Sequence, residues 1–277
     1  MATKKYPTLR EIRDTHAGKR EYERYLPLSR FVFRPVGFLL TWLAIRVGLT
    51  SEAVSWWSGF VGLIGYGCLM SGREQLLPFG IGALIFFNIL DCVDGSISRC
   101  MKTQNPYGQF LDSIMAWIDM GFWALIGIMA FRNPEFLFCP NPMGYSPIFW
   151  LAVGGLACYF HNLIGLLEGT FEQYIRVGWN GIRTDSNNSS DNMPNKDGKD
   201  ASCPYKRTLI SIIGKINHNL RVRETHYLLL VLAYLSKVID LLLITYLFYY
   251  FIHVILLLVI YCCRGRQLRK FYLQERL

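Results

Sequence analysis

Residues 91–112 read DCVDGSISRCMKTQNPYGQFLD, and the interpretation of the whole chain starts from this stretch. Asp91 and Asp94 are three residues apart, a spacing that puts both carboxylates on one face of a helix. Asp112 follows at the start of the next apolar segment. Long apolar segments flank the stretch on both sides, and ionisable groups within or beside a membrane are costly. The three acids therefore predict a functional site that holds a hard divalent cation through oxygen.

Apolar stretches of about 20 residues, the length that crosses a bilayer, recur along the chain. Of the 277 residues, 52% are hydrophobic, and the polar ones gather in residues 1–50, in residues 173–223 and in the tail. This distribution predicts an all-α integral membrane protein with six transmembrane helices. We expect a turn near Lys237 and Asp240, with an intramembrane ion pair of these two residues as the alternative. The six predicted spans are 54–70, 79–95, 108–131, 147–168, 225–241 and 243–263.

The segment before the first span has a different character. Residues 22–42 interleave aromatic and aliphatic side chains with arginines and contain two prolines, which favours an amphipathic helix lying in the membrane interface. We therefore divide the chain into a cytoplasmic N-terminal segment (1–50) with this helix, a membrane domain (51–263) and a basic cytoplasmic tail (264–277). Within the membrane domain, the low-complexity residues 184–202 predict a disordered cytoplasmic loop.

The basic residues orient the predicted bundle. Most of the 29 Lys and Arg lie in residues 1–50, in residues 170–223 and in the tail. The positive-inside rule then puts both termini and the 91–112 motif on the cytoplasmic side. This asymmetry and contact with anionic lipid account for the formal charge of +9. We expect no nucleic-acid partner, because the basic residues are spread along the membrane edges without a recognisable binding module.

The cysteines indicate neither a zinc site nor a disulfide framework. The eight cysteines include no C-x2-C pair of the zinc type, and most lie in or beside apolar segments. We expect Cys262 and Cys263, at the end of the last predicted span, to be packed core cysteines. The alternative is palmitoylation of the pair beside a membrane end.

The motif has the spacing D-x2-D-G-x2-S-R-x8-G-x3-D. This pattern resembles the signature of the CDP-alcohol phosphotransferase family of membrane enzymes, D-x2-D-G-x2-A-R-x8-G-x3-D-x3-D. Ser98 replaces the alanine of the family, and the resemblance covers roughly residues 50–131. The residues on the family's fixed positions are Asp91, Asp94, Gly95, Arg99, Gly108 and Asp112.

The resemblance implies a metal site and a nucleotide site. It assigns Mg²⁺ or Mn²⁺ to Asp91, Asp94 and Asp112. Gly95 has no side chain and lets the nucleotide approach the backbone, while Arg99 can pair with its phosphates. The run from Glu52 to Ser55 is similar to a further nucleotide contact of the family, although it also fits a helix cap. The expected nucleotide contacts are Gly95, Ser98, Arg99, Asn105, Gly108 and Ser55.

One departure from the pattern concerns the general base. The last aspartate of the signature would fall at residue 116, where this chain has Ala116. In the family that aspartate helps to hold a second metal ion and is the favoured base. Three readings stay open. Another group serves as base (Asp119, His161 or Glu168), the acceptor is already anionic, or the chain is inactive or an engineered mutant. We favour altered acceptor chemistry.

These observations predict a transferase that moves a substituted phospho-group from a CDP-linked alcohol to an acceptor alcohol or an anionic acceptor, releasing CMP. The resemblance also implies a role in phospholipid or head-group biosynthesis and a homodimer. A divalent-cation transporter is the alternative from another class, and a catalytically silent family member is the third. Basic residues before the fifth span could hold an anionic acceptor, but we favour positive-inside anchoring for them. They are Lys206, Arg207, Lys215, Arg221 and Arg223.

Overall fold

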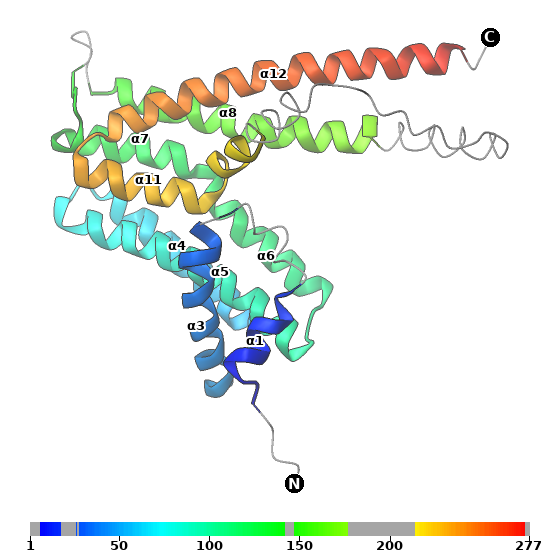
Figure 1. The fold of residues 1–277 in the computed structure, drawn as a ribbon. Helices are drawn as coiled ribbons and strands as arrows, with labels where there is room; N and C mark the ends of the chain where they lie inside the picture. The colour runs from blue at the N-terminus through cyan, green and yellow to red at the C-terminus, as the bar shows by residue number, and fades with distance from the viewer. Residues whose placement is uncertain (1–5, 18–25, 27, 142–146, 177–213, 275–277) are drawn as a thin grey trace.

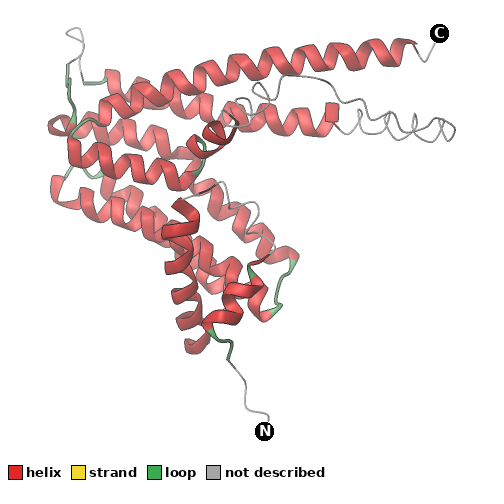
Figure 2. Cartoon of the chain, viewed as in Figure 1, coloured by secondary structure: helices red, strands yellow, loops and turns green. Residues whose placement is uncertain are grey.

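The computed structural model describes residues 6–17, 26, 28–141, 147–176 and 214–274. Within these ranges all regular structure is helical and there is no strand (Figures 1 and 2), which confirms the all-α expectation. The predicted disordered loop 184–202, together with Lys206 and Arg207, lies outside the described residues.

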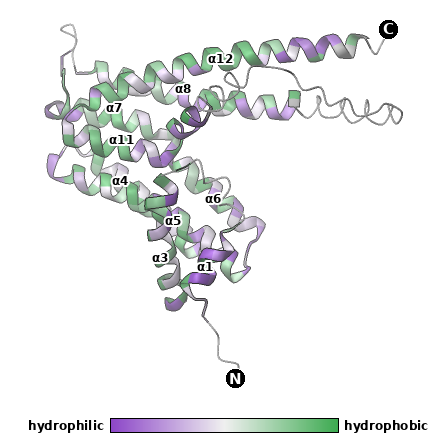
Figure 3. Cartoon of the chain, viewed as in Figure 1, coloured by the Kyte–Doolittle hydropathy of each residue, from purple (hydrophilic) through white to green (hydrophobic). Residues whose placement is uncertain are grey.

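Five helical stretches are long and apolar enough to cross a membrane, which indicates an integral membrane protein. They fall on the predicted spans 54–70, 79–95, 108–131, 147–168 and 243–263. Apolar residues dominate these helices, and hydrophilic residues gather at their ends (Figure 3). The five are α4 (Ser51–Met70), α5 (Leu77–Met101, preceded by the short helix Glu74–Leu76), α6 (Pro106–Ile118) continued through Asp119–Gly121 by α7 (Phe122–Arg132), α8 (Phe149–Phe171, continued by Glu172–Arg176) and α12 (Ile239–Gln274).

The remaining predicted span, 225–241, is occupied by α11 (Arg223–Ser236), which has 14 residues. It ends where Lys237 adopts the left-handed conformation, and α12 begins two residues later, which confirms the predicted turn. The side chains at this turn have separate partners. Asp240 accepts hydrogen bonds from the backbone N–H groups of Phe138 (3.0 Å) and Cys139 (2.8 Å), and the Lys237 ammonium lies 5.6 Å from the ring centroid of Phe136.

Two helical segments precede the spans. Helix α1 (Leu9–Thr15) begins with a capping box in which Thr8 and Glu11 exchange hydrogen bonds. A π-helical turn (Ser29–Phe33) leads into α3 (Arg34–Val47), which ends at Gly48 with a positive φ of 83°. Helix α3 packs against α5 through one face and exposes apolar side chains on the other. The buried residues are Gly37, Thr41, Ala44 and Ile45; the exposed ones include Val36, Leu39, Leu43 and Val47.

The main core lies among α4, α5, α7, α8, α11 and α12 and is rich in aromatic side chains. Trp123, Trp150 and Tyr227 are fully buried there. Helices α7 and α8 approach closely because two glycines face each other: a Cβ added at Gly154 would lie 2.6 Å from the Cα of Gly127. A second, smaller cluster fastens α1 and α3 to the motif end of α5 and so positions the site. It contains Ile12, Ala44, Ile45, Val54, Val93 and Ile97.

The surroundings of Cys262 and Cys263 on helix α12 differ from the expectation of a packed core position. Its C-terminal part packs on the end of α8, where Tyr261 stacks on Phe171 with a centroid distance of 4.0 Å. Cys262 and Cys263 lie beside this packed face rather than on it, and both are exposed. The prediction that they are packed core cysteines is therefore wrong.

Candidate functional site

The motif forms a helix–turn–helix corner. Helix α5 carries Asp91 and Asp94 and ends at Lys102, which has a φ of 55°. After three residues, Asn105 caps α6: its side-chain oxygen accepts a hydrogen bond from the backbone N–H of Gly108 at 2.7 Å. Proline follows as the first residue of α6, where it suits a helix start. This short corner returns α6 alongside the helices that precede it and brings Asp112 towards α5.

Three carboxylates converge at this corner. One oxygen each of Asp91, Asp94 and Asp112 lies within 4.8 Å of the others. Asp94 is buried, Asp91 is half-buried and Asp112 is exposed, so the group opens to the surface on the α6 side. Carboxylate oxygens gathered in this way suit a hard cation such as Mg²⁺ or Mn²⁺. The predicted ligand set is therefore close enough to share one ion.

Asp94 is held by neighbours on two elements. The Ser55 hydroxyl on α4 donates a hydrogen bond of 2.6 Å to one carboxylate oxygen, and the backbone N–H of Gly95 donates to the other. Ser55 was expected as a nucleotide contact or as part of a helix cap. Its position on the first turns of α4 also lets it orient a member of the acid group.

Asp91 is held by a residue far away in the sequence. Arg223, at the start of α11, forms an ion pair with Asp91 and donates a second hydrogen bond of 2.9 Å from Nε to the side-chain oxygen of Asn88. Its guanidinium also lies over the ring of Phe87, 4.9 Å from the centroid. Only the general charge pattern had marked Arg223, as an anchoring residue. The structure shows it in contact with the acid group, 132 positions along the chain from Asp91.

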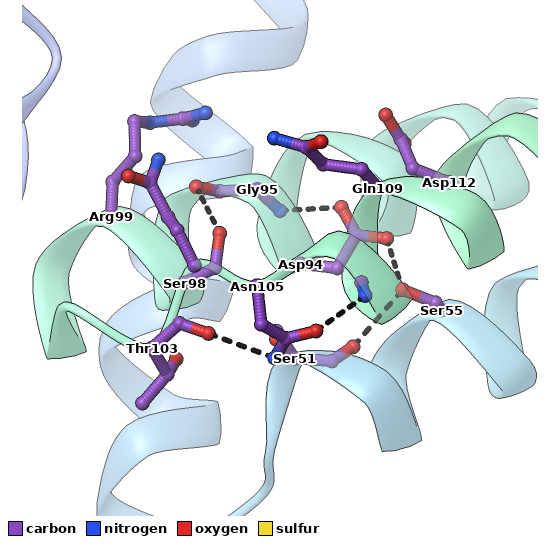
Figure 4. Close-up of a pocket in the computed structure, with 12 residues that line it drawn as sticks. Ser51, Ser55, Asp94, Gly95, Ser98, Arg99, Thr103, Asn105, Gln109 and Asp112 are labelled. Atoms are coloured by element: carbon purple, nitrogen blue, oxygen red, sulfur yellow. Dashed lines mark hydrogen bonds between the residues drawn. The ribbon is translucent and has the colours of Figure 1, made fainter.

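A polar cavity of about 150 Å³ adjoins the acids (Figure 4). Arg99 folds back over Gly95: a Cβ added at Gly95 would lie 3.1 Å from the Nη1 atom of Arg99. All six expected nucleotide contacts line this cavity together with two of the acids. The lining residues are Ser51, Ser55, Asp94, Gly95, Ser98, Arg99, Thr103, Gln104, Asn105, Gly108, Gln109 and Asp112.

A second cavity, of about 380 Å³, shares part of its wall with the first. The residues common to both are Ser51, Thr103 and Asn105. At this wall the side-chain amide of Asn105 donates hydrogen bonds to Glu52 (3.3 Å) and to the backbone oxygen of Thr103 (3.1 Å). The N-terminal segment closes the far side with Tyr6 and Pro7. The two cavities thus form neighbouring spaces around the start of α6.

The candidates for a general base are not among the residues that line either of these two cavities. Asp119 directly follows α6 and accepts hydrogen bonds from the hydroxyls of Tyr66 and Tyr227, the latter at 2.7 Å. His161 lies in a cluster of rings, 4.9 Å from Tyr250 between centroids. These contacts satisfy the side chain of Asp119 and place His161 among aromatic core residues, so neither is brought into the acid group.

Glu168 is also engaged elsewhere. Both of its oxygens accept hydrogen bonds from the guanidinium of Arg221, at 2.7 and 2.8 Å. This pairing raises the pKa of Arg221, although burial acts in the opposite direction. Ala116 is exposed on α6, one turn after Asp112. No carboxylate other than the three motif acids is therefore assembled with them among the described residues.

The comparisons with other proteins add no relative. Neither the protein-family models nor the curated proteins match this chain. The assignment of the site consequently depends on its residues and their geometry.

Proposed function

We propose that this chain is a membrane-embedded CDP-alcohol phosphotransferase, acting in the synthesis of phospholipids or related head groups. An acceptor oxygen forms a bond to the phosphorus that carries the alcohol, the bond from that phosphorus to the bridging diphosphate oxygen breaks, and CMP leaves. The proton of an acceptor hydroxyl passes to a base or to water. The observation that carries the proposal is the meeting of three carboxylates within 4.8 Å beside a cavity lined by the rest of the motif.

The acids are suited to hold Mg²⁺ or Mn²⁺. Such an ion, when bound, neutralises the charge of the diphosphate and favours departure of CMP. The chain itself orients two of the three ligands: Ser55 and the N–H of Gly95 hold Asp94, and Arg223 holds Asp91. Groups that orient metal ligands in this way strengthen metal binding substantially.

The two neighbouring cavities support a placement in which the diphosphate and the nucleoside of the nucleotide occupy different cavities. A nucleoside diphosphate is larger than the space beside the acids alone, so we place its diphosphate there, within reach of Arg99. We place the nucleoside in the second cavity. Glu52 lines the second cavity beside Asn105 of the shared wall, and a carboxylate there can accept a hydrogen bond from the amino group of cytosine. This arrangement favours CDP over UDP as the carrier.

The acceptor is inferred from the absence of a carboxylate at residue 116. Asp119 and Glu168 already have hydrogen-bond partners. An acceptor that is already anionic needs no base, and Arg223 beside Asp91 supplies positive charge near the acid group. The variant Ala116→Asp tests this point. We expect no gain of activity on an uncharged polyol acceptor, and a clear gain would remove the reason to infer an altered acceptor.

The proposed topology has six crossings with both termini and the site in the cytoplasm. Helix α11 supports this arrangement although it is short, because it leads from Arg223, beside the acid group, to Lys237, beside the Phe136–Cys139 turn. It therefore leads from the acid group towards the opposite end of the bundle. The basic residues at the motif end support the cytoplasmic side. We further propose that helix α3 lies in the membrane interface and that the chain forms a homodimer.

The test is CMP release by the purified chain in lipid nanodiscs. A panel of CDP-alcohols is combined with uncharged and anionic acceptors in Mg²⁺ or Mn²⁺, and we expect CMP with at least one pair and none after chelation. Asp112→Asn should lower the rate by about 100-fold. The control Glu74→Gln removes an exposed acid at the other end of α5 and should have no effect.

Other outcomes would favour the alternatives. Intramembrane acids also mark ion pathways, so metal flux into liposomes without CMP release would indicate a divalent-cation transporter. CDP binding without turnover across the whole panel would indicate a catalytically silent protein. Either result would overturn the transferase proposal.

A further inference from the structure

Helix α12 is longer than a bilayer requires. Its 36 residues extend about 54 Å at 1.5 Å per residue, against a hydrocarbon core of about 30 Å. The helix and the end of α8 run well beyond α7 and α11 (Figure 1). Exposed apolar side chains continue to Ile260, and exposed basic ones follow. Cys262 and Cys263 lie at this boundary, just before Arg264, Arg266, Arg269 and Lys270.

The packing of α12 on α8 leaves the two cysteines accessible. Tyr261 stacks on Phe171, and the guanidinium of Arg264 lies 5.8 Å from the same ring. A Cβ added at Gly265 would lie 3.7 Å from Ile175. Residues 261, 264 and 265 share one helix face. Residues 262 and 263 are turned away from that face by about 100° and 200°, since successive residues differ by about 100°.

The other described cysteines differ from this pair. Cys92 is buried, while Cys68, Cys100 and Cys158 are half-buried. Cys139 is exposed, but it lies at the opposite end of the bundle, where its backbone N–H donates to Asp240. Among the described residues, only Cys262 and Cys263 combine exposure with the boundary between apolar and basic sequence.

We propose that Cys262 and Cys263 form an S-acylation site. The sulfur of a cysteine attacks the thioester carbonyl of a fatty acyl-coenzyme A, a new carbon–sulfur bond forms, and the bond to the coenzyme sulfur breaks. The cysteine proton ends on the released coenzyme A thiol. Because the acceptor thiols lie at the end of the apolar stretch, the acyl chains enter the adjacent leaflet directly. The basic residues that follow favour its anionic lipids.

The modification would fix the protruding end of α12 to the membrane surface. Among the described residues, the helix end contacts α8 through the stack of Tyr261 on Phe171 and through Arg264 beside the same ring. Burial of an acyl chain in the leaflet would add to the attraction of the basic residues, because one chain together with a basic patch anchors more firmly than either alone. The inference uses the proposed cytoplasmic position of the tail and does not depend on the transferase activity.

The test is metabolic labelling in a eukaryotic host that acylates a co-expressed control protein. The full-length chain is labelled with an alkyne analogue of palmitate, purified and treated with hydroxylamine, which cleaves thioesters. We expect hydroxylamine-sensitive label on the wild type, at least a tenfold reduction in the double variant Cys262→Ser/Cys263→Ser, and unchanged label in the matched control Cys139→Ser.

Two results would overturn the proposal. One is wild-type chain without label while the control protein is labelled, and the other is equal labelling of the wild type and the double variant. The elution profile in size-exclusion chromatography verifies that the double variant folds. CMP release is measured on the same preparations, so a failure of the transferase proposal is seen separately from a failure of acylation.

Discussion

The motif half of the molecule and its C-terminal half bring polar groups together in different ways. In α4–α6, a helix period and one capped turn gather Asp91, Asp94 and Asp112 from a single stretch of 22 residues. The C-terminal half supplies partners from a distance: its Tyr227 is 108 positions from Asp119, and its Arg223 is 132 from Asp91. The comparison indicates that a local motif specifies the ligands of a site, whereas packing of the whole bundle supplies the groups that orient them.

The largest expected effect is on the rate of CMP release, and it distinguishes Asp94 in the acid group from Asp119, which Tyr227 of the C-terminal half contacts. Asp94→Asn removes a charged ligand, so CMP release should fall by about 100-fold with little change in thermal stability. Asp119→Asn weakens two tyrosine hydrogen bonds, which should cost about 1–2 kcal/mol of stability but lower the rate less than about threefold. Rates and thermal unfolding of both variants are measured in the same nanodiscs. An unchanged unfolding temperature with a 100-fold lower rate in Asp119→Asn would identify it as the base.

Arg223 of the C-terminal half contacts Asp91 of the motif half, and Arg221 provides the matched control. Arg223→Ala removes the partner of Asp91, and we expect the rate to fall by about 30-fold with a weaker affinity for Mn²⁺. Arg221→Ala breaks the pair with Glu168 and should change the rate by less than about threefold, because a partly exposed pair contributes little. Mn²⁺ titrations of the activity separate the two. Equal effects of both variants would show that only general positive charge matters.

The C-terminal half should be sensitive to the contact between α7 and α8. Gly154→Ala puts a methyl group 2.6 Å from the Cα of Gly127, so the helices must separate, at a cost of about 1–3 kcal/mol. The neighbouring Gly155→Ala meets no atom within 4 Å and should leave stability nearly unchanged. Thermal unfolding in detergent measures both. Similar unfolding temperatures for the two variants would contradict the close helix contact.

The smallest expected effect concerns the nucleotide side of the motif half. In Gly95→Ala the new methyl group lies 3.1 Å from the guanidinium of Arg99, which must move. We expect the KM for the CDP-alcohol to rise by about tenfold, or 1.4 kcal/mol, with a smaller change in kcat. Gly82→Ala on the same helix meets nothing within 4 Å and serves as control. A kcat effect without a KM effect would place Gly95 outside the nucleotide site.

The sequence predicted the helical class, five of the six expected spans as long apolar helices, and the convergence of the acids, because these follow from hydropathy and helix period. It did not predict that α11 would have only 14 residues or that Ser55 would hold Asp94. It also gave no sign of the pair between Arg223 and Asp91. These features depend on contacts between distant helices, which periodicity within a helix does not contain. Cys262 and Cys263 were misjudged because the apolar stretch does not reveal which face of α12 meets α8.

The most direct measurement of the central claim is binding of Mn²⁺ to the purified chain, followed by electron paramagnetic resonance. The claim is that Asp91, Asp94 and Asp112 share one divalent cation. We predict one saturable Mn²⁺ site per chain that Mg²⁺ competes for, weakened at least tenfold by an Asn substitution at any of the three positions and unaffected by Glu74→Gln. Equal Mn²⁺ binding by the wild type and the three Asn variants would contradict the account.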